Sequence, residues 1–419
     1  MCRNRLRSVA AATLIASVFS LAGTARAATN EIDQMRLAAH QLAGAQLPSG
    51  LLDFYIDFLA GQGVGSGSTD IERTAFIARQ AGTAYVLAKY LAWSKDTSVN
   101  AVVQRLIATL GSLSLQVGKS TPQRWIESLH LLSTPIGRYK LHAILERLGL
   151  LYQPTGRGRL LSYEGGYATA WAGSTALALM AELEYFRATG DDRFAELRSS
   201  WLEGLRTLYV PGRGFREYPG SIEEEAYANG ETWLALATYG GLFPADETVR
   251  ALLSQYDDYV MEKYSAEPDL QFYSWGTMAA ARRLATTSDS KFAKFIAAQA
   301  SHFLDQEVPA AQQRDNTCAF VEGLAAAAAV LAKHDEDGAL LQKLTTRIDR
   351  EMTKNRALQI PAGTAQLDYP GGTFFHSTRL AEYAGAYLSG GGNLYARIDV
   401  TAHCLSALTE IQSIAAGRD

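Results

Sequence analysis

The residues of this sequence that could do chemistry recur in front of successive apolar segments. Aromatic rings stack on the C–H faces of sugars, while carboxylate, amide and guanidinium groups hydrogen-bond to hydroxyls. Arginine also binds a carboxylate through two parallel hydrogen bonds, which suits a uronic acid. We therefore expect the following residues to bind a carbohydrate: Tyr163, Trp171, Arg216, Tyr227, Tyr273, Trp275, Asn316, Arg379, Arg397 and Asp399.

Three further residues have side chains suited to acid–base catalysis. Glu217 and Tyr218 are adjacent in a loop-like segment, and His403 lies four residues after Asp399. On a helix this spacing places Asp399 and His403 on one face, where the carboxylate could orient the imidazole. A core histidine with satisfied hydrogen bonds is an equally good interpretation of His403.

The reaction class stays open at this stage. Epimerisation at carbon 5 of a uronate and β-elimination both begin by removing the proton beside the carboxylate, which needs a base and a stabilising cation. Tyr218 or His403 could be the base, and Arg216 or Arg397 the cation. A hydrolase instead needs two carboxyl groups about 5–9.5 Å apart. The candidates for that pair are Glu217, Glu225, Asp315 and Glu322.

Each of these residues, taken singly, also has a structural interpretation. Tyrosines and tryptophans at helix ends often cover the rim of a core with their polar atoms in water. The acidic run 223–225 suits the positive start of a helix. Asp315 suits an N-cap, and a buried Arg397–Asp399 pair could brace the last helix. The recurrence of such residues at the same end of successive helices favours a functional site.

The elements that must position these residues are predicted to be helices. Long windows rich in Ala and Leu have helical periodicity, whereas the alternation typical of strands is scarce. A repeated phrase pairs a small-residue-rich apolar helix with a more amphipathic one. The small-residue helices are expected in the segments 73–96, 167–194, 224–243, 271–292, 316–338 and 396–414.

Six such helices, each with an outer partner, predict an all-α fold, an (α/α)6 toroid with an inner and an outer layer. The first helix of the mature chain, 32–44, could pair with the last and close the ring. A superhelical solenoid of helix pairs is the alternative. Residues 28–419 then form a single toroid domain, with extra helices inserted around 123–156. The loops before the inner helices would lie where the cleft opens, and loops often carry function.

Two groups of short motifs resemble the C-terminal domain of the D-glucuronyl carbon-5 epimerase family. The segment 215–219, FREYP, followed by Asn229 and Gly230, is similar to a Glu-Tyr-Pro motif and a following Asn-Gly of that family. The stretch from Gly372 to His403 is similar to its closing Gly-Thr and Ala-Arg-X-Asp…Thr-His pattern. The resemblance covers more than half of the chain, toward its C-terminus.

This resemblance implies a toroid of the kind also used by N-acylglucosamine 2-epimerase-like, polysaccharide lyase and hydrolase families. It implies catalytic roles for Glu217 and Tyr218. Two further catalytic tyrosines of the family correspond to Phe375 and Val400, neither of which can exchange a proton. The resemblance therefore implies the fold and a uronate-type ligand, and it leaves epimerase activity itself open.

Residues 1–27 have the pattern of a bacterial export signal. Basic residues precede the apolar stretch 9–23, and small residues at Ala25 and Ala27 mark a cleavage site. A membrane anchor fits less well, because a spanning helix needs about 20 apolar residues. We therefore expect a periplasmic or secreted protein that is not inserted in the membrane after cleavage.

The net charge of the chain limits the classes of molecule that it is expected to bind. The formal net charge is −4, and removal of residues 1–27 takes away four arginines and no acids, which leaves about −8. A mildly acidic chain is a poor candidate for nucleic acid. The sequence has no phosphate-binding loop, serine-nucleophile elbow or metal-ligand cluster. We expect no cofactor and no metal, and a polysaccharide or oligosaccharide as partner; the oligomeric state is left open.

The favoured function is a carbohydrate-active protein with epimerase-like chemistry at carbon 5 of a uronic-acid-containing polysaccharide. A polysaccharide lyase or a glycoside hydrolase is the alternative on the same fold. A non-catalytic alternative is a polysaccharide-binding or scaffold protein of an exopolysaccharide secretion system. The absent tyrosines favour the scaffold, whereas the density of ionisable residues in the loops favours an enzyme.

Two cysteines, Cys318 and Cys404, remain after removal of the signal. They fall in the fifth and sixth inner helices, which are neighbours in a closed ring. An oxidising compartment permits a disulfide between them, and two separate small buried residues are the alternative. Cα atoms more than about 7 Å apart would exclude the bond.

Overall fold

The computed structural model describes most of the chain that follows the N-terminal segment. The described residues are 31–58, 62–63, 77–118, 156–162, 170–304, 314–334, 338–369, 373–391 and 393–416. The expected export signal at 1–27, the expected insertion at 123–155 and Tyr163 lie outside them. Among the described helices, none combines the length and the apolar character needed to cross a bilayer.

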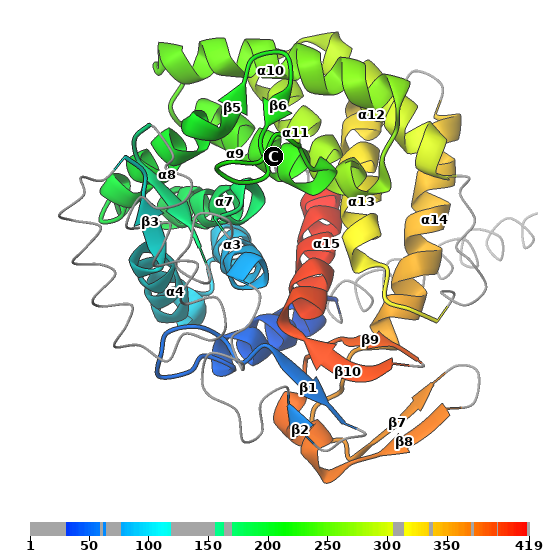
Figure 1. Cartoon of the computed structure of the whole chain (residues 1–419). Coiled ribbons are helices and arrows are strands. Elements are labelled where there is room, and N and C mark those ends of the chain that lie inside the picture. Colours follow the sequence, from blue (N-terminus) through cyan, green and yellow to red (C-terminus); the bar gives the residue numbers. More distant parts are fainter. Residues whose placement is uncertain are drawn as a thin grey trace, which may run out of the picture.

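Within the described residues, six inner helices form a closed ring (Figure 1). Each inner helix contacts the next along the chain, and the last contacts the first. They are α3 (Ile77–Ser94), α7 (Ala172–Thr189), α9 (Ala226–Leu242), α11 (Leu270–Thr287), α13 (Cys318–His334) and α15 (Ile398–Ala416). Closure of the ring confirms the predicted (α/α)6 toroid, because the end repeats of a solenoid stay apart.

An outer helix follows each inner helix from α3 to α13 and packs against it. These are α4 (Asn100–Ser112), preceded by the turn η1 (Thr97–Val99), and α8 (Ala195–Leu208), α10 (Glu247–Ala266), α12 (Ser290–Leu304) and α14 (Ala339–Arg356). Helical residues 31–44 pack beside α15, where Gln412 donates a hydrogen bond to Glu31. The predicted pairing of the first and last helices is confirmed.

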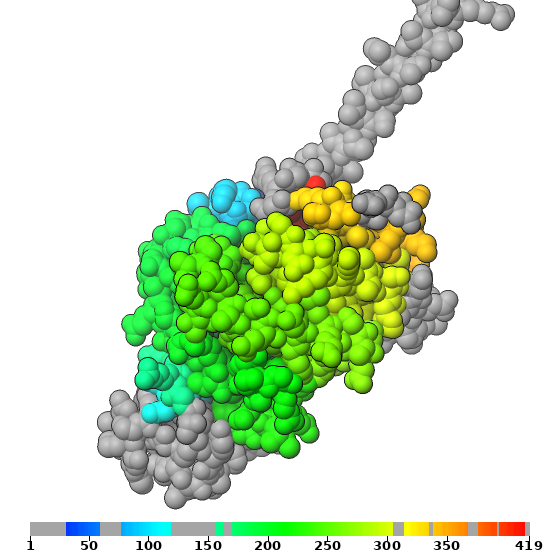
Figure 2. Space-filling view, turned by 90° about the horizontal axis from the view of Figure 1, so that it is seen from above, coloured from blue at the N-terminus to red at the C-terminus, as the bar shows by residue number. Residues whose placement is uncertain are grey.

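The two layers differ in burial because their sequences differ. In α7 every residue from Ala172 to Tyr185 is buried, since an inner helix has neighbours on all sides. In α14 the buried positions, such as Leu344, Ile348 and Met352, recur every three or four residues, so one face is left to solvent. Figure 2 shows this outer layer, from green to orange, as a continuous surface.

Short antiparallel ribbons lie in the segments between the helices. The strands are β1 (Tyr55–Asp57), β2 (Gln62–Gly63), β3 (Ser114–Gln116), β4 (Arg159–Leu161), β5 (Tyr209–Val210), β6 (Gly214–Phe215), β7 (Gln366–Tyr369), β8 (Thr373–His376), β9 (Leu388–Gly390) and β10 (Asn393–Arg397), with a 3-10 turn η4 (Thr378–Tyr383). In the described residues, the largest sheet has the order β2-β1-β10-β9. Its strands lie together at the lower edge of Figure 1.

The start of the last inner helix differs from the prediction. The predicted helix begins at Ala396, but α15 begins at Ile398, and Arg397 is the last residue of β10. Arg397 lies opposite Tyr55 of β1 in the antiparallel register. Pairing across the sheet therefore holds Arg397 in place at the mouth of the ring.

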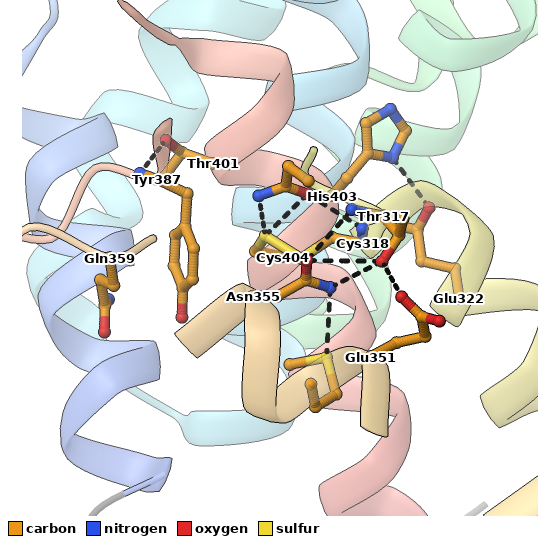
Figure 3. The surroundings of a disulfide bond; sticks show 12 residues. Thr317, Cys318, Glu322, Glu351, Asn355, Gln359, Tyr387, Thr401, His403 and Cys404 are labelled. Atoms are coloured by element: carbon orange, nitrogen blue, oxygen red, sulfur yellow. Dashed lines mark hydrogen bonds and ion pairs between the residues drawn. A yellow bond between two sulfur atoms is a disulfide. The ribbon is translucent and has the colours of Figure 1, made fainter. Parts of the chain in front are cut away.

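A disulfide joins Cys318 at the start of α13 to Cys404 on α15, with the Cα atoms 4.8 Å apart (Figure 3). Of the two interpretations that the sequence left open, the structure has the disulfide. The bond forms because ring closure makes α13 and α15 neighbours, although the two cysteines are 86 residues apart in sequence.

Reduction of this disulfide is expected to destabilise the fold. A cross-link that closes a long loop restricts the unfolded chain, and losing it costs about 2–5 kcal/mol. Thermal unfolding of the wild type should shift to lower temperature with a reductant. The double variant Cys318→Ser, Cys404→Ser should melt low with or without reductant. An equal melting temperature for the oxidised wild type and the variant would contradict a stabilising role.

Candidate active site

A cavity of about 610 Å³ lies at the end of the ring where the inner helices begin. Its wall includes residues near the start of inner helices, among them Arg79 of α3, Ser174 of α7 and Tyr227 of α9. The loops before these helices contribute Glu217 and Asp315. This is the end of the ring at which the sequence analysis expects a site.

Most of the residues selected from the sequence meet at this cavity. Those that line it are Trp171, Glu217, Tyr227, Trp275, Asn316, Arg397, Asp399 and His403. The carboxyl groups of Glu225 and Asp315, considered for a hydrolase, line it too. These residues come from loops and helices far apart in sequence, so the ring closure brings them together.

Other selected residues lie elsewhere. Tyr218 and Arg216 are partly buried in the loop after β6 and are not among the lining residues. Tyr273 is fully buried and packs against the rings of Phe303 and Phe320, so it is a core residue. Arg379 forms an ion pair with a neighbouring glutamate in η4 and is also outside the lining.

Two carboxyl groups on the cavity wall have pKa values that are raised by burial and by a nearby carboxylate. Burial raises the pKa of Glu217, and the nearby Glu223 carboxylate raises it further. Burial also raises the pKa of Glu225, to which the Glu217 charge adds. Among the described residues neither forms an ion pair. The influence of Glu217 on the pKa of Glu225 shows that the two carboxyl groups lie near one another.

Glu231 is the cavity residue with the most perturbed carboxyl group. Burial raises its pKa to about 8, with a further contribution from Glu225 and an opposing one from His403. At neutral pH this side chain is therefore protonated and can donate a proton. Glu231 is not among the residues that were predicted from the sequence to bind a carbohydrate or to take part in catalysis. The available signal was that Glu231 is the one charged residue of the otherwise apolar helix α9.

A glycine on the neighbouring helix makes room for the Glu231 carboxyl group. A Cβ atom at Gly173 of α7 would lie 2.0 Å from Oε2 of Glu231 and 3.5 Å from the Cα of Ala228. The bare backbone of α7 therefore covers one side of the carboxyl group closely and reduces its contact with water. This close cover is a direct physical cause of its raised pKa.

Asn229 fixes the loop that carries Glu217 against α9. Its side-chain oxygen accepts hydrogen bonds from the Phe215 amide at 3.3 Å and from the Tyr256 hydroxyl at 2.8 Å. Its amide donates to Glu224 at 2.7 Å. The motif residues 215–219 and Asn229, which carry the family resemblance, thus set the position of Glu217 relative to α9.

His403 is oriented by Glu322 of α13, and Asp399 plays a different part from the one expected. The Nδ1 atom of His403 lies 2.8 Å from Oε2 of Glu322, and its other ring nitrogen points away from that carboxylate (Figure 3). Burial would lower the pKa of His403, but Glu322 and, more weakly, Asp399 and Glu231 raise it above its ordinary value. Since His403 lines the cavity, its second ring nitrogen is available to a ligand there.

Asp399 bridges two arginines instead. Its Oδ2 atom lies 3.1 Å from Nε of Arg79 on α3 and 3.0 Å from a terminal nitrogen of Arg397. The group therefore ties α3, β10 and α15 together at the point where the ring closes. Arg79 was not selected from the sequence, because its partner lies more than 300 residues away.

Two aromatic rings on the cavity wall are exposed. Trp171 and Tyr227 are 38% and 45% exposed, whereas most large apolar residues of the described chain are buried. Such rings suit stacking on a sugar. Trp275 is buried and meets the His403 ring edge-on at 6.2 Å between centroids, so it supports the imidazole.

Asn316 has a structural role within the lining. Its side-chain oxygen caps α13 by accepting a hydrogen bond from the Cys318 amide at 2.9 Å, and its amide donates to the Leu388 carbonyl at 3.3 Å.

In the described part of the chain, no set of three or more His, Cys, Asp or Glu residues is grouped closely enough to hold a metal ion.

Comparison with known proteins identifies the fold. No family model matches the sequence, and a search of curated proteins finds no match. An α-1,6-mannanase from Salegentibacter sp. is similar in structure, with 9% sequence identity, a TM-score of 0.58 and coverage of 91% of this chain and 99% of that one. Structures of inactive variants of that mannanase hold α-1,6-linked manno-oligosaccharides.

Two other similar structures have different activities. An unsaturated glucuronyl hydrolase specific for heparin shares 12% identity with a TM-score of 0.52, over 92% of this chain and 97% of that one. A cellobiose 2-epimerase from Bacillus thermoamylovorans shares 11% identity with a TM-score of 0.52, over 91% and 99%. The likeness confirms the (α/α)6 toroid. The resemblance to the glucuronyl carbon-5 epimerase domain stays a prediction.

Replacing Glu322 with glutamine is expected to lower the pKa of His403, because the substitution removes the carboxylate that stabilises the imidazolium. The pKa is read from the pH dependence of the His403 ring signals in NMR spectra of the wild type and Glu322→Gln. Asp399→Asn removes a weaker influence and should lower the pKa less. An unchanged pKa in Glu322→Gln would contradict the pairing.

Gly173→Ala is expected to displace the Glu231 carboxyl group and lower its pKa, because the added methyl group would push it toward solvent. The titration of Glu231 is followed by NMR of isotope-labelled glutamate side chains. Gly82→Ala is the matched control: its Cβ would make ordinary contact with Leu177 at 3.7 Å in the same cavity. Equal Glu231 titrations in the two variants would show that Gly173 does not shape the site.

Proposed function

We propose that this protein is a glycoside hydrolase that acts on a polysaccharide or oligosaccharide in the cavity. The observation that carries the proposal is the pair of differently tuned carboxyl groups. Glu231 has a pKa of about 8, while the pKa of the neighbouring Glu225 is raised less. Two carboxyl groups whose pKa values are driven apart are what general-acid catalysis of glycoside cleavage requires.

In this mechanism Glu231 donates its proton to the glycosidic oxygen as the bond to the leaving sugar breaks. The carboxylate form of Glu225 would act on the opposite side of the sugar, either on the anomeric carbon directly or on a water molecule. A separation near 5.5 Å would favour retention of configuration, and a longer one inversion. Trp171 and Tyr227 supply exposed rings on which a sugar can stack.

The structural neighbours support a carbohydrate as substrate but do not choose the reaction. A mannanase, a glucuronyl hydrolase and a cellobiose epimerase share this fold. One fold often serves several chemistries, so the reaction is argued from the residues of this chain. The N-terminal pattern and the Cys318–Cys404 disulfide support an exported, periplasmic or secreted location for that reaction.

A second candidate is the proton-abstraction chemistry that the sequence favoured, as an epimerase or a lyase. It is supported by His403, which Glu322 orients and whose second ring nitrogen could exchange a proton with a ligand. Arg397, which also lines the cavity, adds a positive charge. Tyr218 and Arg216, the other residues considered for this chemistry, are outside the lining. Val400 lines the cavity where the family would have a tyrosine, so this candidate has one acid–base group fewer.

Glu231→Gln is expected to reduce the release of new reducing ends from polysaccharides by about 100- to 10,000-fold, because a glutamine cannot donate the proton. The wild-type activity should fall as the pH rises through about 8, where Glu231 loses its proton. The surface variant Glu247→Gln, on an 84% exposed side chain of α10, is the matched control and should keep full activity.

The same incubations separate the alternatives. Solvent deuterium in the sugar without new ends would indicate an epimerase, and new absorbance from unsaturated ends would indicate a lyase. Binding without any of these products would indicate a scaffold protein. Reducing ends formed equally by the wild type and Glu231→Gln would refute the assignment of Glu231 as the acid.

A further inference from the structure

Charge is distributed unevenly around the cavity. Four acidic side chains on its wall, Glu217, Glu225, Glu231 and Asp315, form no ion pair with any described residue. We call these four the acidic wall. Within this wall, burial raises the pKa of Glu231 to about 8, so this side chain largely keeps its proton at neutral pH.

The positive groups of the cavity are already engaged. Arg79 and Arg397 both bind the carboxylate of Asp399, at 3.1 and 3.0 Å. His403 binds Glu322 at 2.8 Å. A carboxylate on a sugar would therefore have to share a cation with Asp399 or Glu322, and it would also be repelled by the acidic wall.

An unsatisfied hydroxyl group beside the acidic wall points to a polar ligand group at this place. Ser174 on α7 is 1% exposed and lines the cavity, and its Oγ atom makes no hydrogen bond within the described residues. It follows Gly173, whose backbone covers the Glu231 carboxyl group. A buried hydroxyl group without a partner is costly, so a polar ligand group that donates a hydrogen bond to Oγ, or accepts one from it, would relieve it.

Two aromatic side chains beside the acidic wall also favour a positively charged ligand group. Burial raises the pKa of the Tyr227 phenol, and the nearby Glu231 and Glu225 raise it further, while the residue as a whole is 45% exposed. Trp171, also exposed, lines the same cavity. The face of a tyrosine or tryptophan ring attracts a cation. Carboxylates, a hydrogen-bond acceptor and aromatic faces together suit an ammonium group.

We propose that the cavity selects its carbohydrate by charge, binding sugars that carry a protonated amine and excluding sugars that carry a carboxylate. The substrate class is then an amino-sugar-containing glycan with free amines rather than a uronic-acid polymer. The inference rests on the proposed function for the location of the site, but its test measures binding and does not depend on cleavage.

The test compares three ligands that differ in one group: the methyl glycosides of glucosamine, glucose and glucuronic acid. Binding to the wild-type protein is measured by NMR titration at about pH 6.5, where the amine is mostly protonated. The glucosaminide should bind at least about fivefold more tightly than the glucoside, and the glucuronide more weakly than the glucoside. The preference should shrink as salt is added, because salt screens the charges.

Two variants connect the preference to the acidic wall. Glu225→Gln should lower the preference for the glucosaminide over the glucoside, measured as the ratio of the two affinities in the same variant. Glu247→Gln, on the outer helix α10, removes one charge far from the cavity and should leave the preference unchanged. Thermal melts of both variants check that they are folded, and the wild-type ligand order stands without them.

A glucuronide that binds as well as the glucosaminide would overturn the inference, and so would the absence of measurable glucosaminide binding. The outcomes are separable from those of the hydrolase test. If the charge order holds but Glu231→Gln changes no product, the hydrolase proposal fails and charge selection stands. If Glu231→Gln abolishes cleavage but the three ligands bind equally, charge selection fails alone.

Discussion

The close approach of neighbouring inner helices is the constraint on which the rest of this structure depends. At Gly230 of α9 a Cβ atom would lie 2.6 Å from the Cβ of Trp275, and at Gly323 of α13 it would lie 2.9 Å from the Cα of Ser274. Gly173 of α7 differs, because the atom nearest to a Cβ there is a carboxyl oxygen of Glu231. Larger side chains at these positions would force the helices apart, because packed interiors have no spare volume. The glycines therefore let the ring close at its observed size.

The narrow ring determines the chemistry of the cavity as well as its shape. Helices packed this closely leave Glu231 little contact with water, and the lost hydration raises its pKa. Farther along the bore, Lys89 forms a buried ion pair with Glu410 at 2.5 Å and a hydrogen bond with Ser406. This pair joins α3 to α15 in the interior of the ring.

The junction of α13 with α15 combines covalent and electrostatic contacts. Cys318 and Glu322 are one helical turn apart on α13, and their partners Cys404 and His403 are adjacent on α15. The disulfide therefore lies beside the histidine–glutamate pair and limits how far the two helices can slide (Figure 3). The toroid positions these groups, but the similar structures include hydrolases and an epimerase. The side chains decide the reaction, as in other folds that serve many functions.

The sequence by itself determined the helices and their two classes, because burial on all sides selects small apolar residues and burial on one face selects a period of three to four. It also placed Trp171, Tyr227 and His403 at the correct end of the ring. The sequence could not predict the direction in which each side chain points. Tyr273 and Trp275 are two residues apart on α11, yet Trp275 lines the cavity whereas Tyr273 packs into the core. Periodicity does not fix how each helix is rotated about its axis. The pairing of His403 with Glu322, the bridge from Arg79 to Asp399 and the raised pKa of Glu231 were decided by the tertiary structure. Each depends on contacts between helices that meet only when the ring closes.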